Sequence, residues 1–269
     1  MKSRPVRLPI RCRALNSLLK FSSAPTCERL VSGGIAEPIN QISTLLVSVL
    51  AIYALTVWRK EGRGDPLTLG LSLLAIVIGL GGFVYHGAPS DQHILFEVMP
   101  PILFMVGCFA CILKRMFNLE TLVSLLNIAG FTLFGAFFIA VLPADALGGG
   151  ARYIVPLFAL YIVAVTLILK ARVGLHEDRS LVGAAAQRSD AQHFPKLRAG
   201  YGLLQAGILL AMALAARALD APLCGTVPGG LHPVWHVLAG VAAIKILLVC
   251  IRFPYEAKAA PDFAPRRGL

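Results

Sequence analysis

Long uninterrupted apolar runs dominate the pattern of hydrophobic and polar positions along this chain. Seven runs are about 20 residues long, the length that an α-helix needs to cross a bilayer. None alternates apolar and polar residues like a barrel strand, so helices are the expected spanning elements. The expected spans are residues 38–58, 66–86, 93–113, 119–142, 152–170, 199–217 and 233–251. The pattern predicts an all-α integral membrane protein, a seven-transmembrane-helix bundle.

Composition agrees with a membrane protein and defines three regions. The 269 residues are 57% hydrophobic and 14% charged, whereas a soluble domain carries about 25% charged residues. We expect a basic N-terminal arm and outer segment over residues 1–36, the membrane domain over 37–252 and a cytoplasmic C-terminal tail over 253–269. The formal charge of +11 arises in loops and tails around apolar spans. It therefore indicates membrane topology, and no nucleic acid is expected as a partner.

The basic residues of the loops predict an orientation. The loops after spans one, three and five carry clusters of Lys and Arg, whereas the loops after spans two, four and six carry at most one. The positive-inside rule then places the first set in the cytoplasm and the N-terminus outside. The basic residues of the N-terminal arm oppose this orientation.

Three histidines are expected to meet at the outer face, where even spans end and odd spans begin. His86 ends span two, and His232 and His236 begin span seven. Residues four apart on a helix share a face, and Pro233 favours His232 as the residue that caps the helix. Three imidazoles suffice for a catalytic zinc that keeps its fourth position open. Taken singly, His86 could equally be an interfacial histidine.

Other polar residues leave alternatives open. Glu97, near the start of span three, is either a protonated carboxyl bonded to a neighbouring helix or a general base beside a metal. His176 and His193 fall in an expected basic loop that runs from Lys170 to Arg198, and we expect both to be solvated.

The cysteines divide by position. Those within spans are expected to behave as small apolar side chains. Cys27 and Cys224 fall in outer segments, and their positions leave a disulfide and two free thiols equally open.

Three blocks of sequence resemble the alkaline ceramidase family, in the family's order and at about its spacings. The first is Cys27-Glu28 followed by Ile-Ala-Glu-Pro-Ile-Asn-Gln-Ile-Ser over 35–43. The second is Gly-Leu-Gly-Gly-Phe-Val-Tyr-His over 79–86, with Glu97 eleven residues later. The third runs from Asp220 to Gly240 and includes His-Pro-Val-Trp-His. The chain is identified as a bacterial-type member of this family, which belongs to a wider group of seven-helix membrane hydrolases that includes adiponectin-receptor-like proteins.

The resemblance implies a set of site residues. It assigns zinc to His86, His232 and His236, a catalytic acid to Glu97, a disulfide to Cys27 and Cys224, and calcium to Glu28 and Glu37. The chain departs from the family at Gly82, where the family has a serine, and at Glu97, where the family usually has aspartate. Pro25 stands where the family has another calcium-binding acid.

The expected function is zinc-dependent hydrolysis of ceramide or a related lipid amide to a fatty acid and an amine. Glu97 would take the proton of the attacking water, with Tyr85 or Ser90 as candidate donors to the oxyanion. The expected location is the bacterial inner membrane, among membrane lipids, with the N-terminus and active site facing the periplasm. The alternative is a non-catalytic seven-helix receptor or transporter-like protein that retains a structural zinc site. The sequence defines no oligomeric state.

Overall fold

The computed structural model describes residues 26–32, 36–61, 65–90, 92–143, 145–178, 183–227 and 229–253. Residues 1–25 of the expected arm and residues 254–269 of the expected tail lie outside the described residues. Within those ranges every regular element is helical, which confirms the all-α fold. The elements are α2 (Cys27–Ser32), α3 (Pro38–Glu61), α4 (Pro66–Gly87), α5 (Ile94–Met116), α6 (Thr121–Val141), the 3-10 turns η1 (Ala146–Gly149) and η2 (Ala151–Tyr153), α7 (Ile154–Glu177), α8 (Ala184–Leu219) and α9 (His232–Arg252).

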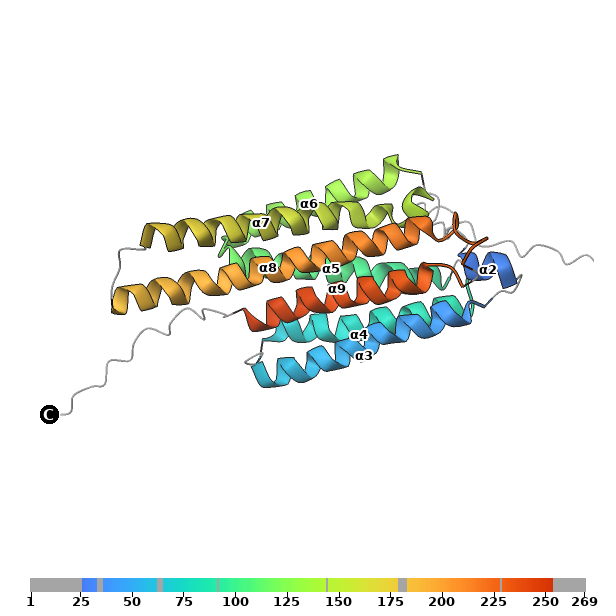
Figure 1. Ribbon diagram of the computed structural model, residues 1–269, viewed down its shortest axis with the longest axis horizontal. Helices are drawn as coiled ribbons and strands as arrows, with labels where there is room; N and C mark the ends of the chain where they lie inside the picture. Colours follow the sequence, from blue (N-terminus) through green and yellow to red (C-terminus); the bar gives the residue numbers. More distant parts are fainter. Residues whose placement is uncertain are drawn as a thin grey trace, which may run out of the picture.

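Seven long helices run side by side as one bundle (Figure 1). Each of α3 to α9 is long and apolar enough to cross a membrane, which indicates a multi-pass membrane protein. Large apolar side chains lie exposed on the outside of the bundle, most densely on α6, where Leu126 and Leu133 are 64% and 70% exposed. A surface of this kind is stable against lipid and costly in water.

Helix α3 packs against α4 and α9, α4 packs against α5, and α8 packs against both α7 and α9. The α3–α4 contact is close because Gly79 has no side chain. A Cβ atom at Gly79 would lie 2.7 Å from the backbone nitrogen of Ser48 and 2.8 Å from the carbonyl oxygen of Thr44. Small residues of this kind let membrane helices approach at backbone distance. The contact fixes α3 and α4 relative to each other at the end of the bundle that holds His86.

The expected loop between spans five and six is wrong, because both flanking helices extend into it. Helix α7 continues to Glu177, and α8 begins at Ala184 and has 36 residues, where the expected span covered 199–217. At 1.5 Å per residue, α8 is about 54 Å long, and it projects beyond its neighbours (Figure 1). Its first turns are polar, so hydropathy does not detect them, although several of their residues are good helix formers.

The expectation that His193 is solvated is also wrong. Its side chain is 13% exposed, and its Nε2 lies 3.5 Å from a carboxylate oxygen of Asp178. The imidazole packs directly over Gly174 of α7. His193 therefore joins the extensions of α7 and α8, whereas His176 is exposed.

A polar cluster closes the end of the bundle opposite His86. Asp65 caps α4 by accepting the backbone N–H of Thr68 at 2.9 Å, and it forms an ion pair with Arg115 of α5. Burial alone would raise the pKa of Asp65, but the bonds from Thr68 and the charge of Arg115 hold it below its ordinary value. The cluster ties α4 to α5 far from the histidines.

Candidate metal centre

Three buried imidazoles meet where α4 ends and α9 begins. The ring centroids of His86 and His236 lie 4.8 Å apart, those of His86 and His232 lie 5.4 Å apart, and those of His232 and His236 lie 4.7 Å apart. The three residues are 0%, 4% and 7% exposed in the order His86, His232 and His236. The structure thus brings together the three histidines that the sequence placed at one membrane face.

Two of the three rings have a hydrogen-bond partner at Nδ1. His86 Nδ1 lies 2.8 Å from Oε2 of Glu37, and His236 Nδ1 lies 2.7 Å from Oγ of Ser43. Ser43 donates its hydroxyl hydrogen to the carbonyl oxygen of Asn40. The arrangement therefore assigns N–H to the Nδ1 of both histidines, with Glu37 and Ser43 as the acceptors. This is the tautomer that leaves Nε2 as the metal-binding atom.

In contrast to the Nδ1 atoms, two of the Nε2 atoms have no partner among the described residues. Those of His86 and His232 are buried and have no hydrogen-bond partner in the described part of the chain. An unpaired buried polar atom costs free energy unless a ligand satisfies it.

Glu97 completes the group. Its Oε1 lies 3.9 Å from His86 Nε2, and one ligand atom from each of the three histidines and Glu97 lies within 4.8 Å of the others. Three neutral imidazoles and a carboxylate form a donor set that could hold a metal ion.

Glu37 organises the His86 side of the centre. Its carboxylate accepts hydrogen bonds from His86 and from Asn40 Nδ2 at 2.9 Å, and its other oxygen accepts from Arg29. Its own backbone N–H donates to the carbonyl oxygen of His86 at 2.9 Å. Burial alone would raise the pKa of Glu37, but His86, Asn40 and Arg29 lower it to about 2. Glu37 is therefore an anion at neutral pH that fixes His86 through both backbone and side chain.

Asp220 organises the His232 side. Its Oδ1 accepts the backbone N–H groups of Leu231 at 2.6 Å and His232 at 2.9 Å. Asp220, which follows the last residue of α8, thus caps the start of α9. The expectation that His232 itself caps the helix is wrong, because the helix begins at His232 and Leu231 is the capping residue.

A disulfide between Cys27 and Cys224 joins α2 to the loop before α9. The other carboxylate oxygen of Asp220 accepts the backbone N–H of Cys27 at 2.9 Å. Helix α2 therefore lies over the histidine end of the bundle (Figure 1) and is connected to both histidine-bearing segments, through Arg29 and Glu37 on one side and through Asp220 on the other.

The acids implied for calcium already have protein donors. Both oxygens of Glu28 accept backbone N–H groups at the start of α3, from Ile39 at 2.8 Å and Asn40 at 3.0 Å. Both oxygens of Glu37 are occupied as well. Glu28 acts as a helix cap, and we propose no calcium ion at these residues.

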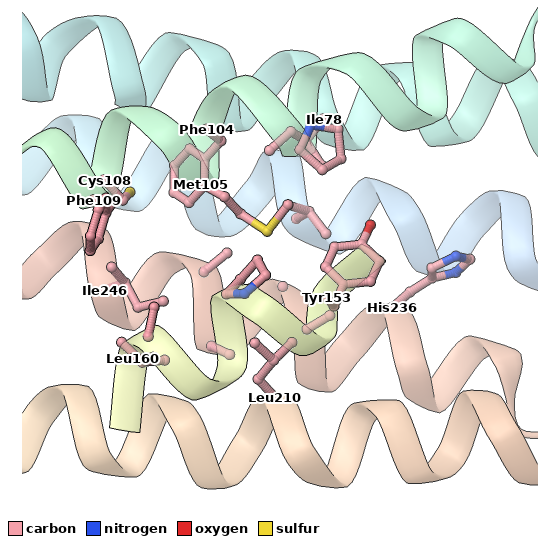
Figure 2. Close-up of a pocket in the computed structure, with 18 of the residues that line it drawn as sticks. Ile78, Phe104, Met105, Cys108, Phe109, Tyr153, Leu160, Leu210, His236 and Ile246 are labelled. Carbon is pink, nitrogen blue, oxygen red and sulfur yellow. The ribbon is translucent and has the colours of Figure 1, made fainter. Parts of the chain in front are cut away.

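An apolar cavity of about 150 Å³ extends into the bundle from the metal group, which consists of His86, Glu97, His232 and His236. Glu97 and Trp235 are among its lining residues. His236 lies at one end of the cavity, and Cys108, Phe109 and Ile246 lie at the other (Figure 2). The cavity gives the centre direct access to a site suited to a hydrocarbon chain.

The hydroxyl groups near the centre differ from the expected ones. Ser90 is exposed, and neither Ser90 nor Tyr85 lines the cavity. Tyr153 does line the cavity together with Glu97 and His236, and its side chain extends from η2 toward α5 (Figure 2). Tyr153 was not foreseen because it lies in a connection between helices, with no motif around it.

Gly82 also lines the cavity, and the space beside it is filled by Thr44. A Cβ atom at Gly82 would lie 2.7 Å from Thr44 Cγ2, while the Thr44 hydroxyl donates to the carbonyl oxygen of Gln41. The glycine is therefore required by the close contact of α3 with α4.

Comparison with models of known protein families found no match to this chain, and a search of curated proteins also found none.

Proposed function

We propose that this chain is a zinc-dependent membrane hydrolase that cleaves the amide bond of a lipid amide, as the resemblance to alkaline ceramidases implies. The observation that carries the proposal is the position of the metal group. Two unpaired imidazole Nε2 atoms, of His86 and His232, lie beside Glu97 and His236, and these last two residues line an apolar cavity. Hydrolysis of a lipid amide needs this combination of a polar reacting centre and an apolar site for the chain.

The metal would be held by Nε2 of His86, His232 and His236. Three neutral nitrogen ligands with one open position are typical of catalytic zinc. Zinc bound there would act as a Lewis acid toward the amide carbonyl and would favour ionisation of a water molecule.

The chain's own residues would supply the remaining steps. Glu97 would take the proton of the attacking water and deliver it to the amine nitrogen as the C–N bond breaks. Tyr153 would donate a hydrogen bond to the carbonyl oxygen as negative charge develops on it. The apolar cavity would hold the acyl chain, and the products would be a fatty acid and a free amine.

We further propose that the protein lies in a bacterial inner membrane with the metal centre toward the periplasm. The basic residues at the ends of α3, α5 and α9 support this orientation, because positive charge is retained in the cytoplasm. The disulfide between Cys27 and Cys224 is consistent with an oxidising compartment on the other side.

Fatty acid release from a panel of lipid amides tests the proposal. Purified protein should release fatty acid, and Glu97→Gln should lower the rate about 10²–10⁴-fold. The same variant should keep its metal, because the three histidines remain. A protein that binds zinc but cleaves no amide in the panel would support the alternative, a structural zinc site, which is favoured by the absence of a hydroxyl at Gly82.

A further inference from the structure

Arg217, in the last turn of α8, is a buried cation without a carboxylate partner in the described part of the chain. The residue is 6% exposed. Its Nε donates to the carbonyl oxygen of Gly148 at 2.9 Å, and its guanidinium lies over the ring of Trp235, 5.1 Å from the centroid. Among the described residues no Asp or Glu oxygen lies within ion-pair distance of it. A buried charge is costly unless an opposite charge or a full set of hydrogen bonds compensates it.

This cation lies next to the metal group. Trp235 lies between His232 and His236 in α9 and lines the cavity. The Arg217 guanidinium packs on the indole ring of Trp235 without lining the cavity itself. The carboxylate of Glu97 acts electrostatically on Arg217, although none of its oxygens lies within ion-pair distance.

A second guanidinium accompanies it. Arg152 donates from Nε and Nη2 to the carbonyl oxygen of Gly149, at 3.2 and 3.1 Å, and lies 5.9 Å from the centroid of the Tyr153 ring. The rings of Tyr153 and Trp235 lie 4.9 Å apart. Two arginines thus contact the aromatic pair, both members of which line the cavity, and each arginine donates to a backbone carbonyl, which carries no net charge.

We propose that Arg217, assisted by Arg152, binds an anionic group on the polar part of the lipid amide. The inference rests on the proposed function, because it names the substrate class of the same site. A guanidinium binds a carboxylate or phosphate through paired hydrogen bonds. A neutral lipid amide such as ceramide would leave the buried cation without an ion-pair partner, whereas an acidic lipid amide would supply one. The substrate class is therefore an N-acyl compound that carries a carboxylate or a phosphate beyond the amide nitrogen.

A matched pair of ligands tests the proposal. N-oleoylglycine and N-oleoylethanolamine share the acyl chain and the amide. The first carries a carboxylate and the second carries a hydroxyl group in its place. Dissociation constants of both would be measured for the full-length protein in a neutral detergent, with mass spectrometry confirming that each ligand remains intact. The wild type should bind the anionic ligand about tenfold or more tightly. N-oleoylethanolamine phosphate, measured alongside, shows whether carboxylate or phosphate is preferred.

Variants identify the residue responsible. Arg217→Gln, which keeps a hydrogen-bond donor for Gly148, should reduce the preference to about twofold or less, and Arg217→Lys should retain part of it. Arg252→Gln, at the opposite end of the bundle, is the matched control and should retain all of it.

Equal affinity of the wild type for the glycine and ethanolamine ligands would overturn the proposal. So would an equal loss of both ligands in the Arg217 variants, which would indicate a structural role. Fatty acid release, measured on the same samples, reports separately on the proposed function. If the protein prefers the anionic ligand but releases no fatty acid, the proposed hydrolysis is contradicted and the anion site is not. If it releases fatty acid without preferring the anionic ligand, the anion site is contradicted and the hydrolysis is not.

Discussion

Replacement of Glu37 by Gln should weaken metal binding although Glu37 is not itself a proposed metal ligand. The carboxylate accepts from His86 and Asn40 on one oxygen and from Arg29 on the other. Its lowered pKa of about 2 shows that the ionised form does this at neutral pH. A Gln side chain has one acceptor oxygen, so its NH₂ group must face either Arg29 or the pair formed by His86 and Asn40. Either orientation places donor against donor.

The expected size of the effect follows from the role of the carboxylate. It fixes the His86 tautomer and ring orientation and increases the basicity of Nε2. Loss of such a partner lowers metal affinity about 10–100-fold, equivalent to about 1.4–2.7 kcal/mol. The backbone bond from Glu37 N–H to the His86 carbonyl remains in the variant, so the fold at the end of α4 should persist.

Competition with a chelator of known zinc affinity, on protein first stripped of metal, measures the change. Glu61→Gln is the matched control, because the same chemical change is made at an exposed residue that pairs with Arg252 at the opposite end of the bundle. The control should bind zinc as the wild type does. A Glu37→Gln protein that is folded and binds zinc within about twofold of the wild type would refute the assignment of Glu37 as the partner that orients His86.

Two further predictions concern stability. Gly82→Ser should destabilise the protein by about 1–3 kcal/mol through overpacking against Thr44, measured as a lower thermal midpoint in detergent. Adding Thr44→Ala should recover most of the lost stability. A double variant with the same thermal midpoint as Gly82→Ser alone would contradict the contact between Gly82 and Thr44. Asp65→Asn should destabilise the protein at neutral pH by about 1 kcal/mol, because it removes the ion pair with Arg115, while the amide oxygen can still cap the helix. The folded-state pKa of Asp65 lies below its ordinary value of 3.8, so its contribution is present above that value and is lost as the pH falls through the folded-state pKa. The stability gap between wild type and variant should therefore narrow below about pH 4, and a gap that widens on acidification would contradict the ion pair.

The sequence predicted the parts of the structure that depend on a pattern of residues within one segment. Seven apolar runs near the length of a bilayer define the spans directly, and the alternation of sides places His86 and α9 at one face. The polar start of α8 was missed because hydropathy responds to lipid exposure, whereas residues 184–198 are helical beyond the apolar span.

The hydrogen-bond partners of the histidines could not be predicted in this way, because they lie far from the histidines in sequence. Glu37 is 49 residues before His86, and Ser43 is 193 residues before His236. The packing of α3 between α4 and α9 makes these contacts, and no spacing rule relates them. Arg217 was equally invisible, because in sequence it resembles an ordinary basic residue at the end of a span.

Zinc analysis of the purified protein tests the central claim most directly. We predict about one zinc per chain in the wild type and its loss when His86, His232 or His236 is singly replaced by Ala, with the helical content unchanged. A wild-type protein that binds no metal when supplied with zinc, or single variants that retain full occupancy, would contradict a metal centre built from these three imidazoles.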